Sequence, residues 1–224
     1  MSDATSVFRR LGTMGWLVLC GSIPPEPPGS GLNTERLLEV TDLSRRPFII
    51  TTQTNLDPAM QALIDDIEIL LGIEIEGINP SDLTDELLQE IWLHAGIIII
   101  SGGSESMWQD LLGARLFRTR PQEIIAEGAV VFAVESAANV MGTWVLDKEM
   151  GEVDKGLGWL LGGVVASTNT DPGEIQPLKE HLEEFEGVYA LGLPAGSMLA
   201  LGPRGEIELW TETAPVVLLG RGWQ

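Results

Sequence analysis

Short runs of apolar residues alternate with segments of helical periodicity along the whole chain, and this alternation restricts the fold more than any other feature. The runs at 16–20, 47–52, 73–78, 97–101 and 129–134 are continuously apolar, as expected of strands that are covered on both faces. Strands that alternate with helices form βα units. The sequence therefore predicts an α/β fold, a three-layer sandwich with a mostly parallel central sheet.

Capping residues mark the helices that are expected between these strands. Asp57 followed by Pro58 starts an amphipathic helix that reaches residue 71, and Thr84 caps a second helix that is expected to end at Gly96. A third helix is expected at 121–126, and residues 23–31 read as a surface loop. In the final third, short strands at 164–166, 188–193, 198–201, 206–210 and 216–219 surround one acidic helix at 177–185. All 224 residues, 1–224, are expected to form a single domain.

Charge and cysteine content exclude several classes of partner. The 33 acidic and 13 basic residues give a formal charge of −20, and an anionic surface repels phosphate backbones and acidic lipid headgroups. We therefore expect neither a nucleic acid nor a membrane as partner. Cys20 is the only cysteine, which excludes an internal disulfide and favours a cytoplasmic location. The apolar run after Arg9 and Arg10 is too short for a secretion signal and is better explained as a first buried strand.

The sequence indicates neither a metal nor a cofactor. His94 and His181 are the only histidines, too few for a histidine-rich metal site. Gly156, Gly158 and Gly162 imitate a dinucleotide fingerprint, but they miss its register and follow no predicted strand. His181 lies on a charged helix and is expected to be solvated. His94 is expected in the last turn of its helix, where an imidazolium favours the helix dipole.

An apolar strand runs straight into Ser136, and small residues then open a helix. This layout is typical of a nucleophile elbow, in which a sharp strand-to-helix turn exposes a serine. Ser136 is then the candidate nucleophile, and the backbone N–H of Ala137 is a candidate oxyanion donor. Val134 and Ala138 stand where such elbows usually have glycine. The alternative is that Ser136 is only the N-cap of an ordinary βα turn.

A second strand, 97–101, ends in a turn that also opens a helix. The residues of this turn are Gly102, Gly103, Ser104 and Glu105. Because the carboxyl ends of parallel strands share one edge of a sheet, we expect the turn to lie beside Ser136. Backbone N–H groups at Gly103 or Ser104 would then supply a second oxyanion donor. The alternative is that the two glycines only make a tight turn.

Taken in order, these motifs resemble the cyanophycinase and dipeptidase E group of serine peptidases, which have a class I glutamine amidotransferase-like fold. The matching features are the Gly-Gly turn and helix at 102–108, the Ser-Ala pair at 136–137, a Gly-Leu-Gly at 156–158 before an apolar strand, and a late strand and turn at 190–197. The resemblance covers most of the chain. It implies a peptidase that cleaves aspartyl peptides or an aspartate-arginine polymer, with Ser136 as nucleophile.

The residues that would complete the catalytic machinery depart from the family's pattern. Thr168 and Asn169 stand where the resemblance implies the catalytic histidine, and Pro194 and Ala195 stand where it implies an acidic pair. A carboxylate at Glu135 would oppose an alkoxide and an oxyanion. Serine without a base is a weak nucleophile. The sequence therefore predicts a protein without peptidase activity that keeps a pocket for a small molecule or peptide, and the alternative is a serine hydrolase whose base is unidentified.

Two expectations concern the three-dimensional structure. Elbows are strained, so Glu135 or Ser136 is expected to have a positive φ. Seven tryptophans exceed what a modest core easily hides, and large aromatic side chains are enriched at interfaces. We therefore expect a homodimer.

Overall fold

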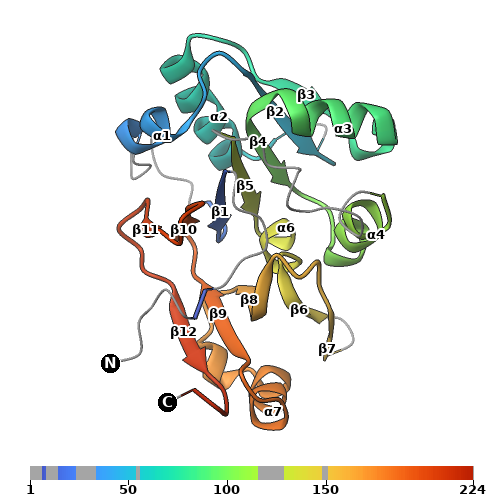
Figure 1. The fold of residues 1–224 in the computed structure, drawn as a ribbon, viewed down its shortest axis with the longest axis vertical. Coiled ribbons are helices and arrows are strands. Elements are labelled where there is room, and N and C mark those ends of the chain that lie inside the picture. Colours follow the sequence, from blue (N-terminus) through green and yellow to red (C-terminus); the bar gives the residue numbers. More distant parts are fainter. Residues whose placement is uncertain are drawn as a thin grey trace.

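The computed structural model describes residues 7–8, 15–23, 34–53, 56–115, 129–147 and 151–223. Its strands form two sheets, which follow one another along the long axis of the molecule (Figure 1). Both sheets are rich in parallel pairs and have helices packed on them, so the predicted α/β class is confirmed. The strands of the final third, however, divide between the two sheets instead of extending one central sheet.

The larger sheet has seven strands, which in spatial order are β11 (Ile207–Leu209), β10 (Met198–Leu201), β1 (Trp16–Cys20), β5 (Val130–Val134), β4 (Ala95–Ser101), β2 (Arg46–Thr51) and β3 (Glu76–Ile78). From β1 to β3 every neighbouring pair is parallel. β10 and β11 add an antiparallel edge beside β1. The carboxyl ends of the parallel strands therefore lie along one edge of the sheet.

The smaller sheet has five strands, which in spatial order are β12 (Val216–Leu219), β9 (Tyr189–Leu193), β8 (Leu160–Ser167), β6 (Gly142–Asp147) and β7 (Glu152–Lys155). β6, β8 and β9 are parallel, and β7 and β12 are antiparallel edges. β6 and β7 were not predicted from the sequence. Gly156 therefore does follow a strand, contrary to the sequence analysis, but the next element is β8 rather than the helix that a dinucleotide fingerprint requires.

The helices lie on the faces of these sheets or at their edges, and they are α1 (Thr34–Val40), α2 (Pro58–Leu71), η2 (Pro80–Asp82), α3 (Asp85–His94), α4 (Glu105–Arg115), α6 (Ser136–Asn139), η3 (Pro172–Glu174) and α7 (Gln176–Glu184). None of the helices described is both long and apolar enough to cross a membrane. The helix expected at 121–126 and most of the loop expected at 23–31 lie outside the described residues.

Local hydrogen bonds explain where α2 and β3 begin. The Asp57 carboxylate accepts from the N–H groups of the first turn of α2, as its capping role predicts. Gly72, with φ 67°, ends the helix. Glu68 Oε1 then accepts from Ile75 N at 2.8 Å, which ties residues 73–75 to the helix. The strand predicted at 73–78 consequently begins only at Glu76.

The second predicted helix has the expected cap and an earlier end. Thr84 Oγ1 accepts from Leu87 N at 3.1 Å, and α3 ends at His94 rather than at Gly96. Gly96 instead belongs to β4, where a Cβ would lie 2.7 Å from the carbonyl oxygen of Asp42. The glycine is therefore needed for a close backbone approach, not for ending a helix.

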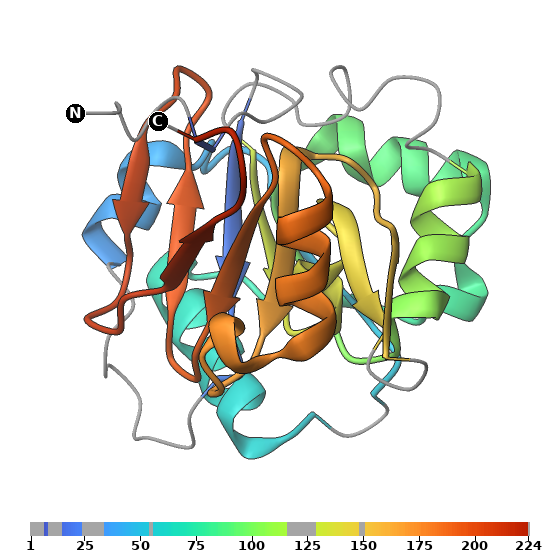
Figure 2. The same ribbon diagram turned by 90° about the horizontal axis from the view of Figure 1, so that it is seen from below.

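The helices cover opposite faces of the larger sheet, as Figure 2 shows. α1 and α2 pack on the face that carries Ile97 and Ile99, and α3 and α4 pack on the face that carries Ile98 and Ile100. The core on the face of Ile98 and Ile100 extends into the smaller sheet, where it includes Val165. One hydrophobic core therefore joins both sheets, with α6 lying between them (Figure 1).

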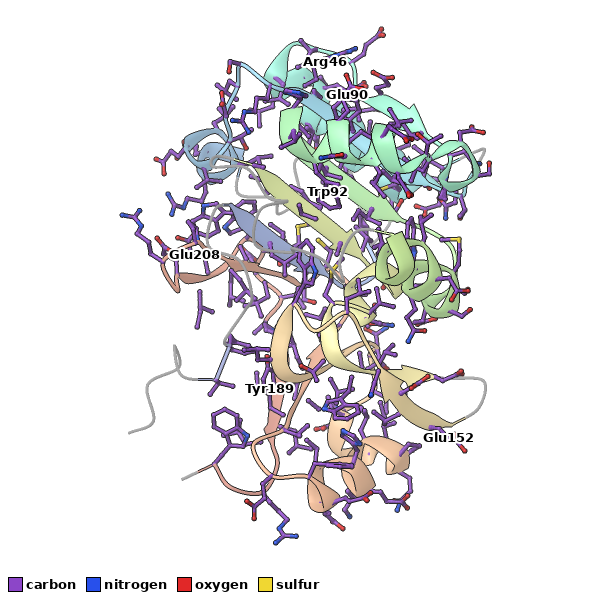
Figure 3. All side chains as sticks on the ribbon, turned by 45° about the vertical axis from the view of Figure 1, so that its right-hand side comes forward. Arg46, Glu90, Trp92, Glu152, Tyr189 and Glu208 are labelled. Carbon is purple, nitrogen blue, oxygen red and sulfur yellow. The ribbon has the colours of Figure 1, made fainter. Side chains whose placement is uncertain are left out.

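The charged side chains lie outside this core. Glu90, Glu152 and Arg46 are exposed, whereas Trp92 and Tyr189 are buried (Figure 3). Among the described residues, the buried polar side chains are all uncharged or histidine: Thr41, Thr51, Ser101, Asn139, His181 and Ser197. The described acidic side chains are thus exposed or half-buried.

Most of the tryptophans are hidden inside the molecule, so the reason given above for a homodimer does not hold. Trp144 and Trp223 are half-buried, and the remaining five are buried: Trp16, Trp92, Trp108, Trp159 and Trp210. The core is larger than the sequence analysis assumed because it spans two sheets. The homodimer stays a prediction.

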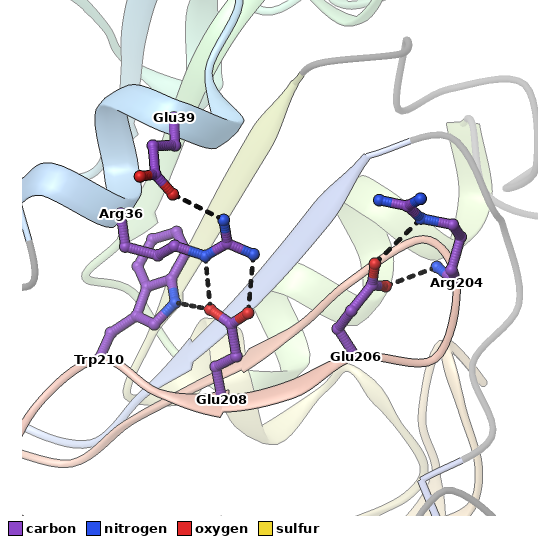
Figure 4. Close-up of polar contacts among 6 residues, drawn as sticks. All are labelled: Arg36, Glu39, Arg204, Glu206, Glu208 and Trp210. Atoms are coloured by element: carbon purple, nitrogen blue, oxygen red, sulfur yellow. Dashed lines mark hydrogen bonds and ion pairs between the residues drawn. The ribbon is translucent and has the colours of Figure 1, made fainter.

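A cluster of polar contacts fastens α1 to the antiparallel edge of the larger sheet (Figure 4). Arg36 donates to both carboxylate oxygens of Glu208 at 2.7 and 2.9 Å, and its third nitrogen donates to Glu39 at 2.9 Å. Trp210 Nε1 donates to Glu208 at 3.1 Å, and the guanidinium lies 5.0 Å from the ring centroid of Trp16. The hydrogen bonds from Arg36 lower the pKa of Glu208, although burial opposes them. The contacts are structural and lie away from the elbow.

Candidate functional site

The elbow turn and the Gly-Gly turn lie side by side. β4 and β5 are hydrogen-bonded parallel neighbours, so their carboxyl ends are adjacent. Ser136 Oγ donates to the carbonyl oxygen of Gly103 at 3.1 Å. The structure thus has the two predicted turns at one edge of the sheet, where α/β proteins usually build their sites.

Glu135 is the strained residue of the elbow. Its φ and ψ are 53° and −114°, and it is the only non-glycine residue with a positive φ in the described part of the chain. Its N–H donates to Cys20 O at 3.0 Å, and its carbonyl oxygen accepts from Asn139 N at 2.9 Å. A nucleophile elbow places the reacting side chain on the strained residue, a conformation that costs on the order of 1–3 kcal/mol. Here that position holds a glutamate, and Ser136 is the first residue of α6.

The Gly-Gly turn is fixed by its own hydrogen bonds. Gly102 and Gly103 both have positive φ, 72° and 70°. Trp108 Nε1 donates to Gly102 O at 2.6 Å, and Ser104 Oγ accepts from Met107 N at 3.2 Å as the cap of α4. The carbonyl oxygens of both glycines therefore already accept hydrogen bonds. The oxyanion roles of the N–H groups at Gly103 and Ser104 stay predictions.

Asn139 links the elbow to the smaller sheet, and the sequence analysis did not single it out. It is 2% exposed, Nδ2 donates to Glu105 Oε1 at 2.8 Å, and Oδ1 accepts from Ser167 N at 2.6 Å. The signal in the sequence was an amide at the end of a segment of small residues next to a predicted turn. This one side chain brings α4, α6 and the carboxyl end of β8 together.

Thr168 and Asn169 lie at that end of β8 and are held by hydrogen bonds to nearby backbone. Thr168 Oγ1 accepts from Thr170 N at 3.0 Å, and Asn169 Oδ1 accepts from Ala195 N at 2.8 Å. The family resemblance implies the catalytic histidine at Thr168 and Asn169 and an acidic pair at Pro194 and Ala195. The hydrogen bond from Ala195 N to Asn169 Oδ1 therefore takes the place of the imidazole–carboxylate pair that a serine peptidase requires.

The two histidines of the chain lie away from the elbow. His94 directly precedes β4, whose seven residues separate it from the Gly-Gly turn by about 23 Å at roughly 3.3 Å per residue. His181 lies on α7, and its neighbours Leu178 and Leu182 pack with Val164 on one face of the smaller sheet. The elbow helix packs with Val165, on the other face. Neither imidazole is placed to act as a base for Ser136.

The prediction that His181 is solvated was wrong. Its side chain is 7% exposed, and its ring centroid lies 4.8 Å from that of Trp144 and 4.6 Å from that of Phe185. The helix is acidic on its outer face only, and His181 lies on its inner face with the leucines. Burial lowers the pKa of His181, against the opposing charge of Glu184.

The lowered pKa of His181 predicts a pH-dependent stability. Below about pH 6.5 the imidazole of the unfolded chain takes up a proton that the buried imidazole does not. The free energy of unfolding is therefore expected to fall as the pH drops from 7 to 5.5, by at most about 1.4 kcal/mol per pH unit. Urea denaturation across this range should show that the free energy of unfolding changes less with pH in His181→Gln than in the wild type. An unchanged slope in His181→Gln, or an equal loss of slope in the exposed control His94→Gln, would contradict the assignment.

Cys20 is buried at the end of β1, and burial raises its pKa far above the usual range of a thiol. Its thiol is therefore protonated and unreactive at neutral pH. Across the described ranges, no group of three or more His, Cys, Asp or Glu side chains is arranged to hold a metal ion.

No protein-family model and no curated protein matches the chain. Among solved structures, fifteen chains match the fold, and two of them are a peptidase and a candidate peptidase E. A peptidase from an acI-B1 Actinobacterium superposes with a TM-score of 0.57 at 15% identity, covering 95% of this chain and 97% of that one. A candidate peptidase E from Listeria monocytogenes EGD-e gives a TM-score of 0.57 at 13% identity, covering 92% and 98%. At these identities the likeness shows a shared fold, which agrees with the fold implied by the resemblance noted in the sequence.

Proposed function

We propose that this chain has the fold of a peptidase E-like serine peptidase without its peptidase activity, and that it binds a small molecule or a peptide at the elbow. The observation that carries the proposal is Glu135 in the strained position where such an elbow would hold its nucleophile. A carboxylate there is a poor nucleophile for an amide, and it repels the oxyanion that acyl transfer must form.

The surroundings of Ser136 support the same conclusion. Its hydroxyl donates to a backbone carbonyl, Gly103 O, instead of to a base. Both histidines lie elsewhere, and Asn169 is occupied by Ala195 N. The part of the chain that the structure describes places no histidine beside this hydroxyl, and a serine hydroxyl without a base stays protonated, which costs the chemical step on the order of 10⁴-fold in rate.

The alternative function is a serine hydrolase that cleaves an aspartyl peptide with Ser136 as nucleophile. One observation favours it, since Ser136 Oγ lies beside the Gly-Gly turn that would supply an oxyanion donor. The base would then have to come from a lysine or from outside the described residues.

A fluorophosphonate probe separates the two functions. We expect no labelling of the wild-type protein above that of Ser136→Ala, and no hydrolysis of aspartyl-leucine above background, because no base activates the hydroxyl. Labelling is measured by intact-mass spectrometry. Stoichiometric labelling of the wild type that disappears in Ser136→Ala would establish the hydrolase instead.

The binding half of the proposal is tested by thermal denaturation with aspartyl-leucine. The amino group of the dipeptide complements the carboxylate of Glu135, so saturating dipeptide is expected to raise the Tm of the wild type and to leave that of Glu135→Lys unchanged. Glu183→Lys makes the same charge change on the exposed side of α7 and serves as the matched control. Equal Tm shifts in both variants would show that the dipeptide binds elsewhere.

A further inference from the structure

The outer strand of the smaller sheet, β12, has an open edge. It pairs with β9 on one side, and the described part of the chain places no strand on its other side (Figure 1). Gly220 N donates to Val188 O, and hydrogen-bonded positions alternate along an antiparallel pair. Every second residue back from Gly220 therefore bonds with β9, whereas the N–H and C=O groups of Val217 and Leu219 point away from it. These backbone groups are placed to bond with another strand.

β12 differs from the other sheet edges in having no charged residue. Each of the other described edge strands, β3, β7 and β11, contains at least one. Charged side chains on an edge strand discourage pairing with another chain. The residues of β12 are Val-Val-Leu-Leu, and Val216, Val217 and Leu219 are 39%, 40% and 45% exposed. Because side chains alternate along a strand, both faces of this edge are apolar, and an edge of this kind is expected to be covered.

The segments on either side of β12 carry opposite charges. Glu212 precedes the strand, Arg221 follows it, and both are exposed. If two β12 strands pair antiparallel, the end of one copy that leads to Glu212 lies beside the end of the other that carries Arg221. Opposite charges across an interface attract and fix its orientation, whereas two chains of formal charge −20 repel each other elsewhere. The strand is therefore complementary to a second copy of itself.

We propose that β12 pairs with β12 of a second copy of this chain, antiparallel and about a two-fold axis at Leu218. Val217 of one copy then lies opposite Leu219 of the other, and the outward N–H and C=O groups of both residues form hydrogen bonds across the axis. The two smaller sheets join into one continuous sheet. No β12 edge is left open, so the assembly closes at a dimer. The strand is short, which predicts a weak dimer with a Kd on the order of 10 µM.

Sedimentation velocity of the full chain, from roughly 1 to roughly 300 µM, tests the dimer. Val217→Lys is expected to stay monomeric throughout, because it places a charge on the pairing edge. Leu209→Lys makes the same charge change on the exposed edge strand β11 and should dimerise like the wild type. A wild type that stays monomeric would overturn the second copy as the partner of β12. A dimer that persists in Val217→Lys would overturn the edge as the interface.

Charge variants test the orientation and leave the strand itself intact. Arg221→Glu puts like charges together at both ends of the interface and should weaken the dimer about tenfold. Glu212→Arg combined with Arg221→Glu restores opposite charges between the copies and should recover the wild-type Kd. Equal Kd values for all three proteins would overturn the antiparallel arrangement.

A cysteine at position 218 tests the two-fold axis. Residue 218 then faces its own copy, so oxidised Leu218→Cys is expected to form a disulfide-linked dimer on a non-reducing gel. Cys20 is buried, and the wild type should give no such product. Leu209→Cys, on β11, is the control and should stay unlinked. Absence of the link in Leu218→Cys would overturn the axis. None of these results depends on the elbow, so the dimer stands or falls separately from the proposed function.

Discussion

The double variant Glu135→Ser, Thr168→His is expected to react with a fluorophosphonate at least about 100-fold faster than Glu135→Ser alone. The strained backbone at residue 135 presents its side chain at the carboxyl edge of the sheet, where an elbow holds its nucleophile. Ser167 N donates to Asn139 Oδ1, so the end of β8 lies beside the elbow helix, and position 168 follows it directly. A positioned general base contributes about 10²–10⁴-fold to the rate. Labelling rates measured by mass spectrometry give the ratio.

Two further variants show which serine reacts. Adding Ser136→Ala to the double variant is expected to leave its rate unchanged, because the nucleophile is then residue 135. Thr168→His alone is expected to give no labelling, since Glu135 still occupies the strained position. If labelling of the double variant were lost with Ser136→Ala, the elbow position would belong to Ser136. If the histidine gave no acceleration over Glu135→Ser, the end of β8 would not be within reach of the elbow.

The buried strands and the edge that carries the site could be predicted because their signals are local. The continuous apolar run at 129–134 predicted a strand covered on both faces, and β5 lies there, in the centre of the larger sheet. Gly102 and Gly103 predicted a tight turn, and their positive φ values confirm it. The adjacency of the two turns followed from parallel pairing alone. Each of these steps depends on backbone geometry that a few neighbouring residues determine.

Which residue of the elbow is strained changes if the boundary between strand and helix shifts by one residue. The sequence favoured Ser136 as the candidate nucleophile. A serine after an apolar strand fits an elbow and an N-cap equally well, so residue type favoured Ser136. The structure puts the positive φ on Glu135, because Val134 is the last residue of β5 and α6 begins at Ser136. Whether a helix starts one residue earlier or later is set by its packing against the rest of the fold.

Other features were missed because they depend on contacts between distant segments. β6 and β7 are short, and only their pairing with β8 and with each other makes them strands. His181 has charged neighbours in the sequence, but Trp144 from β6 and Phe185 enclose its ring in the fold. Asn139 is a polar residue in a helix of four residues, and its partners lie 34 and 28 positions away. The residues that adjoin these positions in the sequence do not indicate such contacts with distant segments.

Asn139→Ala is expected to lower the free energy of unfolding by about 2–4 kcal/mol, because it removes two hydrogen bonds from a buried position at once. Oδ1 is an acceptor for Ser167 N, and Nδ2 is a donor to Glu105 Oε1. The bridge joins the elbow to the smaller sheet. Truncating any other single side chain near the elbow should therefore lower the free energy of unfolding by less. Urea denaturation measures the change. Asn169→Ala is the matched control, because Asn169 is exposed and accepts only one backbone N–H, so its loss should stay below about 1 kcal/mol.

A charge variant tests the same bridge by a different route. Asn139→Asp keeps the acceptor for Ser167 N but places a carboxylate against Glu105, so it should destabilise the protein at pH 7. Adding Glu105→Gln is expected to restore much of the loss, since the glutamine amide can donate to the new carboxylate. The coupling energy of the pair is the change on adding Glu105→Gln to Asn139→Asp minus the change that Glu105→Gln makes in the wild type, and a double-mutant cycle measures both. A cycle without coupling, or an Asn139→Ala loss no larger than that of Asn169→Ala, would show that the elbow is held to the smaller sheet by its apolar packing instead.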